Sequence, residues 1–130
     1  MQKIRLSVFG LLCCSLFEML HAQEQRDFQL VTIAFYNLEN LFDTENDLIT
    51  FDDDRTPDGK DHWTAEIYAD KLTKMAEVLR QIGTDETRDS PAVIGVAEIE
   101  NRKVLEALVT QKSLKPYDYG IVHYDSPDRR

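Results

Sequence analysis

Two runs of apolar residues predict the strands of this chain. The first covers residues 28–36 and is rich in β-branched and aromatic residues. Because its apolar residues follow one another with little alternation, we expect this strand to be buried on both faces. The second run covers residues 92–99 and carries Val-Ile-Gly-Val-Ala at its centre. We expect it to form a second buried strand.

An apolar stripe at helical spacing lies between the two strands. Its members are separated alternately by four and three residues, which is the repeat of one helix face. They are Tyr68, Leu72, Met75, Leu79 and Ile82. Thr64 is a suitable N-cap, Glu66 falls in the first turn, and Gly83 is a good C-terminal stop. The polar residues 84–90 predict a turn after this helix.

The rest of the chain predicts a second helix and a third strand. Residues 102–112 fit a short helix capped by Asn101. Its inward-facing residues are Leu105, Leu108 and Val109. Pro116 ends this helix, and residues 117–124 have strand character. The order of strand, helix, strand, helix and strand predicts an α/β chain.

The first 22 residues have the layout of a secretory signal peptide. Lys3 and Arg5 form a basic start, an apolar run covers residues 6–20, and the small Ala22 precedes a polar stretch. This run is shorter than the roughly 20 apolar residues that cross a bilayer. We therefore expect no stable membrane span, cleavage near Ala22, export to the periplasm or the cell exterior, and a mature domain over residues 23–130. Both cysteines would leave with the peptide.

The charge balance narrows the possible functions. The chain has 15 Lys and Arg against 24 Asp and Glu, a net charge of −9. This acidity argues against binding nucleic acid through basic side chains alone. The acidity is compatible with an enzyme that binds the phosphate of its substrate through a bound cation, because the metal supplies the positive charge. The sequence patterns of P-loop NTPases, dinucleotide-binding folds, serine hydrolases and zinc proteases do not occur.

Three polar residues at the predicted strand ends are the first candidates for chemistry. Glu98 ends the second apolar run, so it either binds a cation or marks the point where the strand reaches solvent. Glu100 falls on the same strand face and competes with Glu98 for such a role. Asn37 directly follows the first predicted strand, where an amide can orient a ligand or form a turn.

The segment 43–61 contains eight acidic residues against two basic ones and shows no periodicity. Asp52–Asp54 offers clustered hard oxygens to calcium. The EF-hand spacing is missing, however, and a solvated acidic loop is the favoured interpretation. His62, Trp63 and Tyr68 flank the loop as a candidate small-molecule wall, although Trp63 is better suited to anchor the start of the helix.

Four motifs occur in order along the chain. They are FYNLENLFD (35–43), TPDGKDHWT (56–64), VIGVAEIEN (93–101) and HYDSPDRR (123–130). Together they resemble the endonuclease/exonuclease/phosphatase superfamily, and most closely its exported bacterial branch. The resemblance implies a DNase I-like four-layer α-β-β-α sandwich. It also implies hydrolysis of phosphodiesters or phosphomonoesters with Mg²⁺ or Mn²⁺, with nucleic acid among the allowed phosphate-ester substrates.

The resemblance further implies roles for single residues. Glu98 occupies the position of a direct metal ligand, and Asn37 that of an amide which helps to hold the phosphate and the metal site. Ala97 stands where Gln is frequent in the family. Arg129 and Arg130 are adjacent guanidiniums suited to phosphate, and they are candidate substrate contacts.

The length of the chain bears on whether the implied domain is complete. A full sandwich of this kind takes about 200–250 residues. The family's Asp-x-Asn loop does not occur, and neither His62 nor His123 matches the His of the family's closing Asp-His pair. We therefore expect residues 23–130 to be the truncated N-terminal part of the domain, inactive alone. Two alternatives stay open. One is a small exported non-catalytic binding module stabilised by calcium through the acidic loop; the other is a nonfunctional truncation product.

Overall fold

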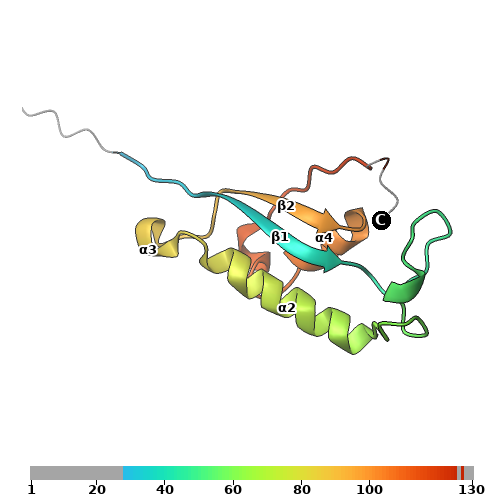
Figure 1. Cartoon of the computed structure of the whole chain (residues 1–130). Coiled ribbons are helices and arrows are strands. Elements are labelled where there is room, and N and C mark those ends of the chain that lie inside the picture. The colour runs from blue at the N-terminus through green and yellow to red at the C-terminus, as the bar shows by residue number, and fades with distance from the viewer. Residues whose placement is uncertain (1–27, 126, 128–130) are drawn as a thin grey trace, which may run out of the picture.

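The computed structural model describes residues 28–125 and residue 127, in which strands and helices are mixed (Figure 1). The elements are β1 (Ile33–Leu41), α2 (Ala65–Gln81), α3 (Thr84–Thr87), β2 (Val93–Ile99) and α4 (Arg102–Val109), with short 3-10 turns at Asp53–Arg55 and Lys115–Tyr117. The predicted α/β class is therefore confirmed. The predicted signal peptide and the candidates Arg129 and Arg130 lie outside the described residues.

The two strands form a parallel sheet, and α2 lies in the connection between them. Pairing is regular from Ile33 opposite Val93 to Asn37 opposite Ala97. The register then shifts, and the next pair joins Leu41 to Ile99. Residues 38–40 of β1 therefore lie opposite a single residue of β2, which makes a bulge at the carboxyl end of the sheet.

The hydrophobic core lies on one face of this sheet. Helix α2 packs against β1 and against α4, and it runs along the sheet in Figure 1. Both helices turn their apolar stripes inward because their apolar residues recur every three or four positions. The buried cluster consists of Leu38, Leu41, Leu72, Ala76, Leu79, Val104, Leu108 and Leu114.

The predicted burial of both faces of the first strand is wrong for the described residues. Ile33 and Phe35 are 75% and 73% exposed, whereas Ala34 between them is buried. The strand also begins at Ile33, and Phe28 lies exposed before it. The physical reason is that α2 and α4 cover one face only. On the open face, a methyl group at Gly95 would come within 2.9 Å of the Phe35 ring, so that ring lies over the glycine.

The predicted helix ends are confirmed, apart from one boundary. The Thr64 hydroxyl accepts a hydrogen bond from the Ile67 amide at the start of α2, and Gly83 beyond its end takes a left-handed φ of 73°. Asn101 caps α4 in the same way, through the amide of Val104. Helix α4 ends at Val109, three residues before the predicted end. The polar segment after α2 contains one helical turn, α3, before the chain turns into β2.

The third strand predicted over residues 117–124 is not formed. The chain makes a 3-10 turn at Lys115–Tyr117 and then has no regular structure through residue 125. Hydrogen bonds from side chains, and not strand pairing, hold this segment against the rest of the fold. The Tyr119 hydroxyl contacts the Ser90 hydroxyl and donates to the Pro91 carbonyl, and Arg102 donates to the Ile121 carbonyl at 3.4 Å. In the described part of the chain, no helix is long and apolar enough to cross a membrane.

Candidate phosphoester site at the carboxyl end of the sheet

The candidates Asn37 and Glu98 are brought together by the pairing of the two strands. Asn37 lies opposite Ala97, so Glu98 follows directly on the neighbouring strand. The carboxyl ends of parallel strands meet at one edge of a sheet. The structure therefore places the predicted amide and the predicted carboxylate at the same edge, within one bulge.

The bulge exists because two leucines three residues apart both enter the core. Leu38 and Leu41 are each 0% exposed. Regular alternation would send them to opposite faces of the sheet. The intervening Glu39 and Asn40 take left-handed φ values of 53° and 57°, and this turn brings Leu41 back to the core side. Opposite them, Glu98 is also left-handed, with φ of 58°.

Asn37 is exposed and takes part in this local structure. Its side-chain oxygen Oδ1 accepts a hydrogen bond of 2.7 Å from the Glu39 amide. Its amide nitrogen Nδ2 has no hydrogen-bond partner among the described residues. The bulge therefore fixes one end of the Asn37 amide and leaves the donor end open to a ligand.

Glu98 is exposed and does not end a buried strand as the apolar run suggested. The left-handed turn carries it out of the strand's alternation, so its carboxylate is hydrated instead of desolvated. Its negative charge acts on Lys71 of α2. An accessible carboxylate at a strand end is a suitable hard ligand for a divalent cation.

Sequence reasoning missed Lys71. Its ammonium Nζ donates to the carbonyl of Glu39 at 2.6 Å and to that of Asn40 at 3.5 Å. It also lies 5.5 Å from the centre of the Trp63 ring. Burial lowers the pKa of Lys71, and the negative charges of Glu39 and Glu98 oppose that shift. Its only sequence signal is its place beside the apolar stripe of α2, which predicts an ordinary surface lysine.

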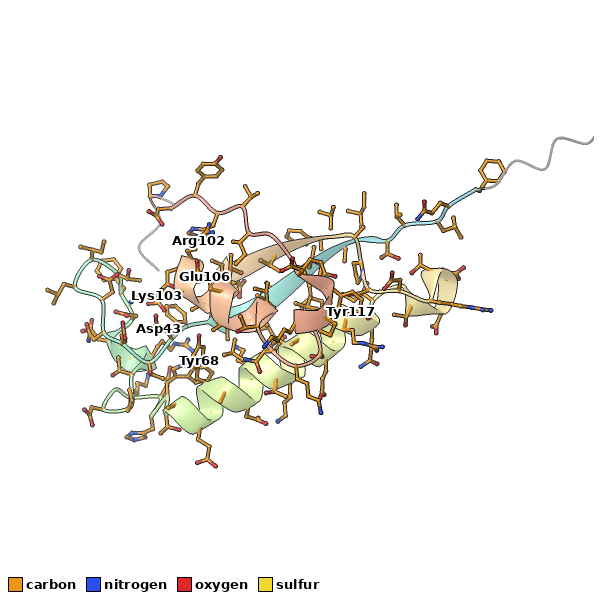
Figure 2. All side chains as sticks on the ribbon, turned by 180° about the vertical axis from the view of Figure 1, so that it is seen from behind. Asp43, Tyr68, Arg102, Lys103, Glu106 and Tyr117 are labelled. Carbon is orange, nitrogen blue, oxygen red and sulfur yellow. The ribbon has the colours of Figure 1, made fainter. Side chains whose placement is uncertain are left out.

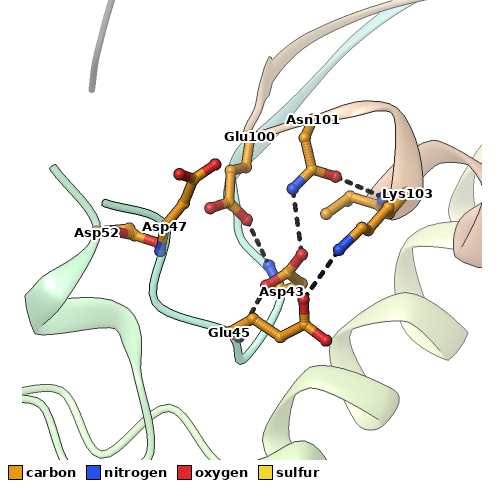
Figure 3. Close-up of polar contacts among 8 residues, drawn as sticks. Asp43, Glu45, Asp47, Asp52, Glu100, Asn101 and Lys103 are labelled. Atoms are coloured by element: carbon orange, nitrogen blue, oxygen red, sulfur yellow. Dashed lines mark hydrogen bonds and ion pairs between the residues drawn. The ribbon is translucent and has the colours of Figure 1, made fainter. Parts of the chain in front are cut away.

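Glu100, the other candidate for a cation ligand on this strand face, instead accepts a hydrogen bond from the backbone of Asp43. Its Oε2 accepts a hydrogen bond of 2.8 Å from the Asp43 amide, and Asn101 donates to the Asp43 carboxylate at 3.1 Å (Figure 3). Nearby, Lys103 pairs with Glu45 at 2.9 Å. Figure 2 shows Asp43 and Lys103 at the same end of the molecule. Of Glu98 and Glu100, Glu98 is therefore the one whose carboxylate remains accessible at the sheet edge.

The carboxyl group of Glu100 lies near the acidic side chains of Asp43 and Asp52, with few positive charges around it. Burial raises its pKa to about 7; the negative charges of Asp43 and Asp52 add to this, and the hydrogen bond from the Asp43 amide opposes it. A carboxyl whose folded pKa is raised stabilises the fold fully below its unfolded pKa, and that contribution is lost as the pH rises toward about 7.

Replacing Glu100 with Gln should therefore stabilise the protein at pH 8 and change little at pH 5. The neutral amide keeps the acceptor for Asp43 and removes the like-charge repulsion. Because the group is half-exposed and screened by water, we expect a gain of about 1 kcal/mol, or roughly 4–8 °C in Tm. Thermal unfolding at both pH values measures it, with the exposed Glu86→Gln as control. An equal Tm for wild type and E100Q at pH 8 would contradict this account.

The acidic loop does not gather its three consecutive aspartates into one site. Asp52 is 1% exposed, and its Oδ2 accepts from the Asp47 amide at 3.0 Å, whereas Asp53 and Asp54 are exposed. Among the described residues, no group of three or more His, Cys, Asp or Glu side chains is arranged so that it could hold a metal ion. The loop acids act instead as acceptors that shape the loop.

Trp63 anchors the loop at the start of α2, as expected from the sequence. Its indole nitrogen donates to the Phe42 carbonyl at 3.0 Å. His62 beside it is exposed with a left-handed φ of 47°, and Tyr68 is half-buried on α2. The small-molecule wall formed by these three side chains stays a prediction.

Comparison with known proteins decides the family. The model of the endonuclease/exonuclease/phosphatase family matches residues 32–130. The chain belongs to this family. The match covers all four sequence motifs, including Asn37, Glu98 and the terminal arginines. No curated protein and no solved structure matches the chain.

Family membership supports the fold and the general chemistry. The mixed strands and helices agree with an α/β fold of the DNase I type. Enzymes of the endonuclease/exonuclease/phosphatase family hydrolyse phosphoesters, act as nucleases or phosphatases, and generally use divalent metals.

Proposed function

We propose that the complete domain to which residues 23–130 contribute hydrolyses phosphodiester or phosphomonoester bonds in a reaction that depends on Mg²⁺ or Mn²⁺, with Glu98 as metal ligand and Asn37 as an amide that helps to hold the phosphate and the metal site. The observation that carries the proposal is the position of these two residues. Within a chain that belongs to a phosphoesterase family, both lie at one edge of the sheet, and both offer polar atoms to solvent.

The residues fit the metal by their chemistry. Mg²⁺ is typically held by one or two carboxylates, with waters and substrate oxygens completing its shell. Glu98 supplies one accessible carboxylate, and Glu100 is engaged with the Asp43 amide. When bound, the ion would polarise a phosphoryl oxygen and supply the positive charge that this acidic chain lacks.

Asn37 contributes orientation. The side-chain oxygen Oδ1 of Asn37 accepts a hydrogen bond from the backbone amide of Glu39. This contact fixes the plane of the Asn37 side chain before substrate arrives. The nitrogen Nδ2 then donates to a phosphate oxygen without reorganising, which is the arrangement that stabilises developing charge most effectively. Arg129 and Arg130 are proposed as additional phosphate contacts on their sequence position alone.

The test is removal and return of the metal. Treating the protein that contains the complete domain with a chelator should reduce hydrolysis of a phosphodiester and of a phosphomonoester to background, and Mg²⁺ or Mn²⁺ should restore it. Comparing DNA, RNA and small phosphate esters identifies the substrate. Full activity in the chelator would contradict the proposal. A Ca²⁺-dependent rise in Tm without any turnover would favour the binding-module alternative.

We also propose that the protein is exported and that its signal peptide is cleaved near Ala22. The basic start and the apolar run of the first 22 residues support this. Intact mass of the exported protein checks it, and retention of Met1 would contradict it.

A further inference from the structure

The bulge beside the candidate site is held in a conformation that its own residues do not favour. Glu39, Asn40 and Glu98 all have positive φ, and two of them are glutamates. A residue other than glycine in the left-handed region costs on the order of 1–3 kcal/mol and persists only where the surrounding structure imposes it. Contacts from outside the two strands must therefore hold this segment.

Lys71 supplies such a contact from α2. Carbonyls in a bulge leave the strand ladder and need other donors. The Lys71 ammonium satisfies the carbonyl of Glu39 at 2.6 Å and approaches that of Asn40 at 3.5 Å. The Trp63 ring lies under the same ammonium, and Trp63 is itself fixed to the Phe42 carbonyl.

Glu39 links Lys71 to the candidate phosphate contact. Its carbonyl accepts from Lys71, and its amide donates to the Asn37 side chain at 2.7 Å. Two hydrogen bonds therefore connect α2 to the Asn37 side chain. The first goes from Lys71 to the carbonyl of Glu39, and the second goes from the backbone amide of Glu39 to the side chain of Asn37. The same bulge faces Glu98 on β2.

We propose that Lys71 is a positioning residue that holds the Glu39–Asn40 bulge, and through it orients Asn37 and Glu98 for metal and phosphate. This inference rests on the proposed function. We assign Lys71 a positioning role and not that of a phosphate ligand, because its two hydrogen bonds go to backbone carbonyls and its charge lies against the Trp63 ring.

A simple electrostatic role makes the opposite prediction. The positive charge of Lys71 acts on Glu98, so removing the charge alone should strengthen the binding of a cation by Glu98. If Lys71 instead fixes the geometry, its removal should weaken binding, as loss of a supporting contact around a metal ligand typically does by about 10- to 100-fold. The sign of the change separates the two roles.

The experiment compares K71M, K71R and the control K74M in the full chain. Lys74 lies on the same helix, is exposed, and pairs with Asp70 at 2.6 Å. We expect Mn²⁺ affinity to fall about tenfold in K71M, to stay within about threefold of wild type in K71R, and to be unchanged in K74M. Titration with Mn²⁺ followed by electron paramagnetic resonance measures it.

Amide hydrogen exchange tests the structural step without any metal. In K71M we expect the Glu39 amide to exchange at least about tenfold faster, while the amides of residues 72–79 in α2 keep their protection. Equal exchange of Glu39 in K71M and wild type, or tighter Mn²⁺ binding by K71M, would overturn the proposal. If wild type and E98Q bind Mn²⁺ equally weakly, the proposed function fails; the exchange at Glu39 still decides whether Lys71 holds the bulge.

Discussion

Replacing Glu98 with Gln is expected to lower metal-dependent phosphoester hydrolysis by roughly 100- to 1000-fold, with little change in stability. The ion contributes several kcal/mol to the transition state, and each 1.36 kcal/mol is a factor of about ten in rate. Gln has the size of Glu but lacks the charge that binds a hard cation. Because Glu98 is exposed, the substitution leaves no buried group unpaired.

The measurement is the initial rate against Mg²⁺ concentration in the protein that contains the complete domain, with Tm recorded alongside. Glu86→Gln is the matched control, since Glu86 is also exposed and lies on α3, outside the proposed site. Near-normal turnover by E98Q at saturating Mg²⁺ would remove Glu98 from the metal site. A loss of rate accompanied by a large fall in Tm would indicate a structural role instead.

Replacing Leu38 with Ala is expected to destabilise the fold by about 2–5 kcal/mol. Leu38 of β1 is fully buried in the core cluster between the sheet and α2. Its truncation therefore removes apolar contacts and leaves a cavity. For a domain of this size, each 1 kcal/mol corresponds to roughly 4–8 °C in Tm. The same side chain forces the bulge, because Leu38 and Leu41 both point into the core.

Urea unfolding measures this loss, and Ile33→Ala is the matched control. Ile33 lies on the same strand and is 75% exposed, so its truncation should change stability by no more than about 0.5 kcal/mol. Equal losses for the two variants would mean that the open face of the sheet is covered in solution, and that Leu38 contributes no more than Ile33.

The local sequence determined helix α2 with both of its ends and the start of helix α4. The spacing of Leu72 and Leu79 on α2, the caps Thr64 and Asn101, and the left-handed Gly83 depend on neighbours within a few residues, and all were predicted. Family membership was also predicted, because the motifs persist as short runs of residues.

The candidate site was predicted in part. The sequence pointed to Asn37 and Glu98 as residues, but it placed Glu98 at the end of a buried strand, whereas the structure exposes it at a left-handed turn. That turn depends on Leu38 and Leu41 meeting helices that are distant in the sequence. No local pattern encodes a register shift between two strands.

What only the tertiary structure decided concerns contacts between segments far apart in the chain. Burial of one face of β1 depends on which side α2 and α4 cover, so a continuous apolar run could not reveal that Phe35 is open to solvent. Likewise, the contact of Lys71 with Glu39 spans 32 positions, and that of Glu100 with Asp43 spans 57. The sequence by itself determined local structure and family, because both reside in short segments; the geometry of the site required the folded chain, because packing sets it.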